Sequence, residues 1–127
     1  MVLLIAVGGE VPLDPAVRES SGLVVGTDDR MWTHGDSGTG SILFAIDSKG
    51  RVTQCVTIDA TNVDWEDIAR QGDALLIGDI GNNRRERETV RVIVVTEPQA
   101  DAEAATPQRT LTLSYPEAIG PFDAEAF

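Results

Sequence analysis

The chain is short of the residues that build several common kinds of site. Its 127 residues include one cysteine, Cys55, and one histidine, His34. A lone cysteine excludes an internal disulfide. One histidine and one cysteine also cannot supply the nitrogen and sulfur ligands of a usual zinc site. Any metal bound by this chain is therefore expected to be held by oxygen atoms.

Positive charge and long apolar runs are also scarce. The chain has 10 basic and 21 acidic residues, a formal net charge of −11. This balance argues against electrostatic binding to nucleic acid or to an anionic membrane surface, and it permits cation binding. No stretch approaches the roughly 18 apolar residues of a membrane-spanning helix. We therefore expect a soluble globular chain, with secreted, periplasmic and cytoplasmic locations all open.

The longest apolar run near the start covers residues 2–7. It is shorter than the apolar region of a complete signal peptide and lacks a preceding basic segment. These residues predict a buried strand, and a truncated targeting segment is the alternative.

Short strand-like segments separated by turn residues fill the rest of the chain, and helical periodicity is weak throughout. The hairpin signal Asp47-Ser48-Lys49-Gly50 is one example of these turns. The expected strands cover residues 23–26, 31–34, 42–46 and 51–58, and then 65–69, 74–77, 89–96 and 109–115. Residues 99–108 lack a strand pattern and predict a connecting loop. The fold class is therefore expected to be all-β.

Clusters of acidic residues recur beside the strand-like runs. They read Glu19-Ser20-Ser21-Gly22, Asp64-Trp65-Glu66-Asp67 and Asp123-Ala124-Glu125-Ala126. Glu19 and Glu66 are 47 residues apart, and Glu66 and Glu125 are 59 residues apart. A period of about 40–50 residues made of short strands is typical of propeller blades. The sequence therefore predicts repeats at about residues 19–63 and 64–115, and a third beginning at residue 123.

This repeat pattern predicts a partial β-propeller over residues 1–127. It is an incomplete arc of between two and three blades, each a four-stranded antiparallel sheet. An open arc leaves strand edges unpaired. We therefore expect the chain either to be the N-terminal part of a longer propeller or to self-associate through its exposed blade edges.

Five ordered motifs lie between residues 17 and 127. They are Glu19-Ser20-Ser21-Gly22-Leu23, Trp32-Thr33-His34-x-Asp36-Ser37-Gly38, Asp64-Trp65-Glu66-Asp67-Ile68-Ala69, Gly78-Asp79-Ile80-Gly81-x-Asn83-Arg84 and Tyr115-Pro116 with Asp123-Ala124-Glu125-Ala126. Together these motifs resemble a family of bacterial six-bladed β-propeller proteins described as phytase-like or esterase-like. The resemblance implies a propeller fold for this N-terminal portion and hydrolase-like chemistry. Two positions depart from the family pattern, since Gly35 replaces the usual Asn and Asn82 the usual Asp.

Blades that repeat around an axis bring equivalent positions to the same end of that axis. Glu19 is expected to be equivalent to Glu66, and Asp36 to be nearly equivalent to Asn82. Ca²⁺ accepts about 6–8 oxygen ligands from carboxylates, amides and water. The candidate calcium ligands are Glu19, Asp36, Glu66, Asp67, Asp79, Asn83 and Glu125. The alternative for each of them is a solvated loop residue of a strongly acidic protein.

Two functions remain open at such a site. The first is a metal-dependent hydrolase of esters, lactones or phosphoesters, in which His34 or Glu66 activates water. The second is a non-catalytic propeller module that binds a small molecule or a protein partner at the axial face, with any metal structural. For His34 the alternative is a loop or rim histidine that is hydrogen-bonded to backbone. No Gly-x-Ser-x-Gly motif supports a serine nucleophile.

Overall fold

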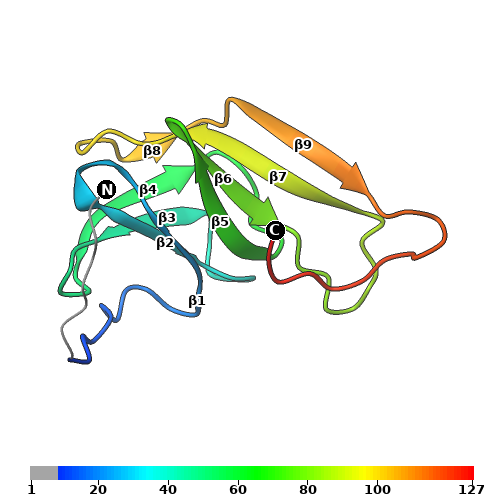
Figure 1. Cartoon of the computed structure of the whole chain (residues 1–127), viewed down its shortest axis with the longest axis horizontal. Coiled ribbons are helices and arrows are strands. Elements are labelled where there is room, and N and C mark those ends of the chain that lie inside the picture. Colours follow the sequence, from blue (N-terminus) through cyan, green and yellow to red (C-terminus); the bar gives the residue numbers. More distant parts are fainter. Residues whose placement is uncertain (1–8) are drawn as a thin grey trace.

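The computed structural model describes residues 9–127, so the predicted strand at residues 2–7 lies outside the described residues. The described chain folds into nine strands and one short 3₁₀ turn (Figure 1). In order, the elements are β1 (Ser20–Val25), η1 (Thr27–Asp29), β2 (Met31–Gly35), β3 (Ile42–Ile46), β4 (Val52–Ile58), β5 (Trp65–Gln71), β6 (Ala74–Asp79), β7 (Thr89–Thr96), β8 (Ala104–Ala105) and β9 (Arg109–Ser114). The predicted all-β class is therefore confirmed.

The strands form two sheets. Sheet A has the order β1-β2-β3-β4-β8, and sheet B has the order β5-β6-β7-β9. In sheet A, strands β1 to β4 pair in sequence order, each antiparallel to the next. In sheet B, β5, β6, β7 and β9 pair in the same way, although β8 lies between β7 and β9 along the chain. Both sheets therefore contain four strands in an antiparallel order. A closed ring of sheets is not formed by residues 9–127.

Strand β8 is the one element that the sequence does not predict, because it lies in the expected loop at residues 99–108. It pairs in parallel with the end of β4, through Thr57 with Ala104 and Ile58 with Ala105. The Gln54 side chain also donates hydrogen bonds to the carbonyls of Gln99 and Ala102. The connection from β7 to β9 therefore returns to the outer edge of sheet A and holds the two sheets together.

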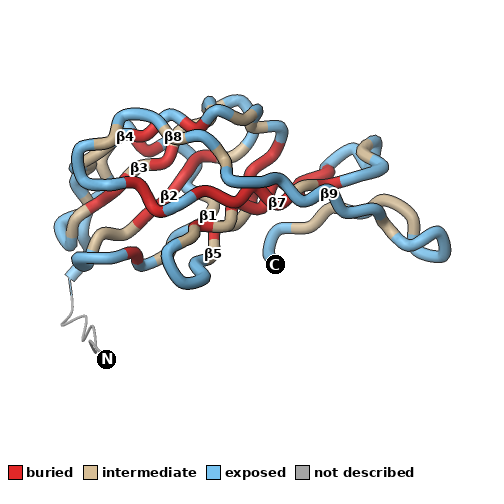
Figure 2. The backbone as a smooth tube through the Cα atoms, turned by 90° about the horizontal axis from the view of Figure 1, so that it is seen from above, coloured by how far each residue is buried: buried red, intermediate tan, exposed pale blue. Residues whose placement is uncertain are grey.

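The two sheets pack face to face around a single apolar core. Strand β1 lies against β5. The core contains Trp32, Leu43, Ala45, Val56 and Ile58 from sheet A, and Trp65, Ile68, Leu75, Ile77, Ile93 and Val95 from sheet B. Both tryptophans are fully buried. Figure 2 shows the buried stretches in the middle of the molecule and exposed backbone in the turn after β9.

Alternation along the strands decides which side chains enter this core. Trp32 in β2 pairs with Ala45 in β3, and both point into the core, whereas the next pair, Thr33 with Phe44, faces the other side of sheet A.

None of the helices among residues 9–127 is long and apolar enough to cross a membrane.

Candidate functional site

Acidic side chains gather where β5 begins, next to the loop that follows β6. Asp64 directly precedes β5, Glu66 is its second residue, and both are buried. The pairing of β5 with β6 shifts register between Trp65 and Asp67, so Glu66 is the extra residue of a β-bulge. The loop comes very close at Gly81, where an added Cβ would lie 2.2 Å from Asp64 Oδ2 and 2.7 Å from Glu66 Oε1. An alanine at this position would require the carboxyl groups of Asp64 and Glu66 to move.

Glu66 is the centre of this acidic cluster, which consists of Asp64, Glu66 and Glu125. The pKa of Glu66 is raised to about 8, first by burial and then by the negative charges of Asp64 and Glu125 and by hydrogen bonds with both carboxyls. Asn83 donates a hydrogen bond from Nδ2 to Asp64 Oδ2 at 3.2 Å. The carboxyl of Glu66 is therefore held in its neutral form near pH 7 unless a cation balances the cluster.

A hollow of about 240 Å³ adjoins the cluster. Its lining includes Ser37, Asp64, Asn83, Arg84 and Arg87. Carboxylate, amide and guanidinium groups thus meet at one concave surface, formed by the loops after β2 and β6 and the residues before β5. Among residues 9–127, however, no group of three or more histidine, cysteine, aspartate or glutamate side chains is arranged to hold a metal ion.

Asp79, predicted as a calcium ligand, instead belongs to a buried ion-pair network. Its Oδ1 accepts hydrogen bonds from Arg87 Nη1 at 3.1 Å and from the Asp64 amide at 2.9 Å. Its Oδ2 accepts from Nε and Nη2 of Arg91, which pairs with Asp79 across β6 and β7. Each oxygen thus accepts hydrogen bonds from two donor atoms. The arginines therefore replace the cation that the sequence interpretation assigned to this residue.

His34 is fully buried between the two sheets, so its ring does not reach the surface. Its Nδ1 donates to the Gly35 carbonyl at 2.9 Å, and the ring meets the Trp65 indole edge-on at a centroid distance of 5.8 Å. Burial lowers the pKa of His34, opposed by the carbonyls of Gly35 and Asp67. The ring is therefore held neutral and bonded to backbone. The alternative interpretation expected the backbone bond, but it placed His34 in a loop or at a rim rather than buried in β2.

The other predicted ligands lie apart from the cluster. Glu19 is exposed and lines a different hollow with Arg18, Thr39 and Phe44 of the sheet A side. Asp67 accepts hydrogen bonds at its carboxylate from the amides of Ile68 and Phe127. Asp36 is half-buried, and its carbonyl accepts hydrogen bonds from Thr39 and Asn62. The structure thus brings together Glu66, Glu125 and Asn83 of the predicted set, with Asp64 added.

The register of the sheets explains why Glu19 and Glu66 are separated. Between β1 and β2, Ser20 pairs with Gly35, and Gly22 pairs with His34. Between β5 and β6, Trp65 pairs with Asp79, and Asp67 pairs with Gly78. The extra residue of the bulge lies between these pairs in both sheets, and it is Ser21 in β1 and Glu66 in β5. Ser21 of sheet A therefore corresponds to Glu66 of sheet B, and Glu19 corresponds to Asp64. The expected equivalence of Glu19 with Glu66 is wrong by two residues, and Asp36 corresponds to Ile80 rather than to Asn82.

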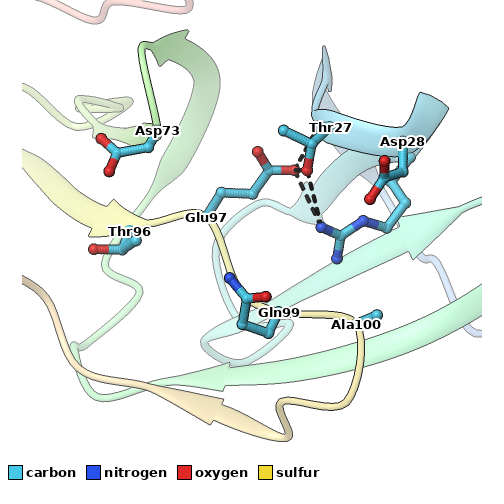
Figure 3. Close-up of a pocket in the computed structure, with 8 residues that line it drawn as sticks. Thr27, Asp28, Asp73, Thr96, Glu97, Gln99 and Ala100 are labelled. Carbon is cyan, nitrogen blue, oxygen red and sulfur yellow. Dashed lines mark hydrogen bonds and ion pairs between the residues drawn. The ribbon is translucent and has the colours of Figure 1, made fainter.

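A second polar site lies at the other end of the sheets, where Glu97 follows β7. Figure 3 shows its carboxylate among residues from both sheets, beside a hollow of about 230 Å³. Glu97 Oε1 accepts hydrogen bonds from the Thr27 amide at 2.8 Å and from the Trp32 indole at 3.0 Å. Arg30 and Arg70 each approach a carboxylate oxygen to 3.5 Å. Glu97 therefore connects sheet B to the β1–β2 turn of sheet A.

The sequence interpretation missed Asp64, Arg87, Arg91 and Glu97 as site residues. Asp64 belongs to the same acidic motif as the candidates Glu66 and Asp67, so this motif was enough to identify it as a site residue. The two arginines stand four residues apart around the start of β7, a spacing that the sequence alone does not connect with Asp79.

Comparison of the chain with models of protein families, with curated protein sequences and with solved structures gave no match.

Proposed function

We propose that the two sheets are successive blades of a β-propeller and that the acidic cluster binds Ca²⁺ at one end of the blades. The blade interpretation is supported by the two matching four-stranded meanders, which stack face to face and carry a bulge at the same register position. In a propeller the innermost strands of neighbouring blades lie side by side, and β1 and β5 do so here.

One observation carries the calcium proposal. Carboxyl groups from two distant parts of the chain, Asp64 with Glu66 and Glu125, meet, and among residues 9–127 no basic side chain forms an ion pair with them, whereas nearby Asp79 has two arginines. Oxygen atoms from carboxylates and from the Asn83 amide are the donors that Ca²⁺ prefers. Side chains of the cluster must turn for a metal to bind, since their present arrangement is not that of a metal site.

The hollow beside the cluster supports a catalytic extension of this proposal. Ca²⁺ bound there would polarise a carbonyl or phosphoryl oxygen of an ester, lactone or phosphoester. Arg84 and Arg87 line the same hollow and suit an anionic substrate group. Glu66 is the acid–base residue of this proposal, because His34 is buried. A ligand-binding module without turnover is the alternative, with Ca²⁺ serving the structure.

Isothermal titration calorimetry with CaCl₂ tests the binding step. We expect saturable binding to the wild-type chain and at least a tenfold weaker affinity for Glu66→Gln and Glu125→Gln. Glu19→Gln is the matched control, because this carboxyl lies at a separate hollow, and its affinity should equal that of the wild type. No saturable heat with the wild type, or equal losses in all three variants, would overturn the calcium proposal.

A panel of ester, lactone and phosphoester substrates, assayed with and without Ca²⁺, tests the catalytic step. Turnover that needs Ca²⁺ and is lost in Glu66→Gln would support a hydrolase. Calcium binding with no turnover of any substrate would favour the non-catalytic module.

A further inference from the structure

Two open sheet faces carry apolar side chains at positions that are buried elsewhere in the same molecule. The outer face of sheet A is the side turned away from sheet B, and we define it by Leu23, Met31 and Phe44. The outer face of sheet B is the side turned away from sheet A, and we define it by Leu76, Leu111 and Leu113. Leu23, Leu111 and Leu113 are 57%, 39% and 48% exposed.

The outer face of sheet A repeats the inner face of sheet B. Leu23 pairs with Thr33 just as Ile68 pairs with Ile77, and the bulges lie at the same place, so Leu23 corresponds to Ile68. By the same register Met31 corresponds to Leu75 and Phe44 to Ile93. Ile68 is 4% exposed in the contact between the sheets, whereas Leu23 is 57% exposed. The inner face of sheet B, which has the same pattern of side chains as the outer face of sheet A, is therefore already buried in the contact between the two sheets.

The outer face of sheet B repeats the inner face of sheet A. Leu111 pairs with Val92 just as Val56 pairs with Leu43, so Leu111 corresponds to Val56, which is fully buried. Two residues further along, Leu113 corresponds to Ile58, which is 2% exposed. The two open faces are therefore the two halves of the contact that the molecule already makes between its own sheets.

We propose that the outer face of sheet A of one copy binds the outer face of sheet B of a second copy, so that copies of this chain stack head to tail. The arrangement continues the existing order of sheets, A on B and then A of the next copy. Closed propellers have about 4–8 sheets, so about two to four copies would close a ring. An interface of this kind is heterologous, because each copy uses a different face for each of its two neighbours.

Two features of the chain set the conditions of this association. Phe127 lies over Gly78 on the outer face of sheet B, and the incoming β1 must displace its half-exposed ring. Each copy carries a net charge of −11. Repulsion between copies is screened by salt, so association strengthens as the NaCl concentration rises. The proposal does not depend on calcium binding at the acidic cluster.

Light scattering coupled to size-exclusion chromatography tests the proposal with three single variants of equal charge change. Leu23→Lys blocks the outer face of sheet A, and Leu113→Lys blocks the outer face of sheet B. Ile119→Lys is the control, because this residue is 66% exposed and lies in the turn after β9, outside both faces. Circular dichroism confirms that each variant is folded, which is expected because all three side chains are exposed.

The wild type and Ile119→Lys are expected to elute as multiples of 13.6 kDa, and each blocked variant as a monomer. The decisive sample is an equal mixture of the two blocked variants. Each retains the face that the other lacks, so the mixture should form a heterodimer that neither variant forms alone. A monomeric wild type at high protein and salt concentrations overturns the proposal. So does association that only one blocked variant abolishes, or a mixture that stays monomeric.

Discussion

Replacing Glu66 by glutamine should remove a large part of the pH dependence of stability. Burial and the charges of Asp64 and Glu125 raise the pKa of Glu66 from 4.5 to about 8 in the folded chain. A carboxyl with a raised pKa contributes stability that is fully present below the pKa of the unfolded chain, near 4.5. That contribution is lost as the pH rises through the folded value near 8.

The size of the effect follows from the two pKa values. Between about pH 5 and pH 8 the free energy of unfolding of the wild type should fall by up to about 1.4 kcal/mol per pH unit on account of this group. At pH 7 this amounts to a loss of up to about 3 kcal/mol. Glutamine resembles the neutral carboxyl in shape and does not titrate. Glu66→Gln should therefore match the wild type near pH 5 and exceed it in stability at pH 8.

Urea unfolding at several pH values measures this difference directly. Trp32 and Trp65 are both fully buried, so their fluorescence reports the loss of the core. The titrations are done with a chelator, because Ca²⁺ would balance the cluster and reduce the effect. Glu88→Gln, at an exposed position before β7, is the matched control and should follow the wild-type pH profile. Parallel profiles for the wild type and Glu66→Gln from about pH 5 to pH 8 would refute the reasoning.

Two of the other buried carboxylates, Asp79 and Glu97, lead to related predictions. Asp79→Asn should destabilise the chain by about 3–5 kcal/mol, because it leaves the charges of Arg87 and Arg91 without a buried partner. In the same urea assay Asp47→Asn, which alters an exposed pair with Arg51, should cost far less, and similar losses for both would contradict the buried network. At Glu97, burial opposes ionisation, but hydrogen bonds from Trp32 and Thr27 hold the pKa below its usual value. The wild type should therefore lose stability as the pH falls below about 4.5, whereas Glu97→Gln should be less stable at pH 7 and less sensitive to acid. Equal acid sensitivity of the two proteins would count against a role for this carboxylate.

The strands of this protein were largely predictable, because their determinants are local. Turn residues such as Asp47 and Gly50 and the β-branched run of β7 mark their elements without reference to the rest of the chain. The short strand β8 was not predictable, because its pairing with β4 depends on where the β7–β9 connection crosses sheet A. The early start of β1 at Ser20 was missed for a similar reason, since Ser20 and Ser21 have little strand preference of their own.

The candidate site was predictable only in outline. The acidic motif around Glu66 and its later partner Glu125 were recognised from spacing, and the structure brings them together. Asp79 looked like a further ligand, but its partner Arg91 stands opposite it across β6 and β7, and that register is not visible in the sequence. His34 was a candidate general base, yet it is buried in β2 and β5 covers it through Trp65. Charge counts reveal that acids outnumber bases, but not which acids are already paired.

Gly22 gives a final prediction about the contact between the sheets. It belongs to the first acidic motif and lies in β1, directly against β5. A Cβ at this position would lie 3.0 Å from the backbone nitrogen of Ile68 and 3.0 Å from His34 Nε2. Backbone cannot turn aside as a side chain can, so Gly22→Ala should push β1 and β5 apart and cost about 1–3 kcal/mol. Gly9→Ala is the matched control, because no atom lies within 4 Å of its added Cβ. If the two variants unfold at the same urea concentration, β1 and β5 do not approach as closely as described, and the register that relates Leu23 to Ile68 loses its support.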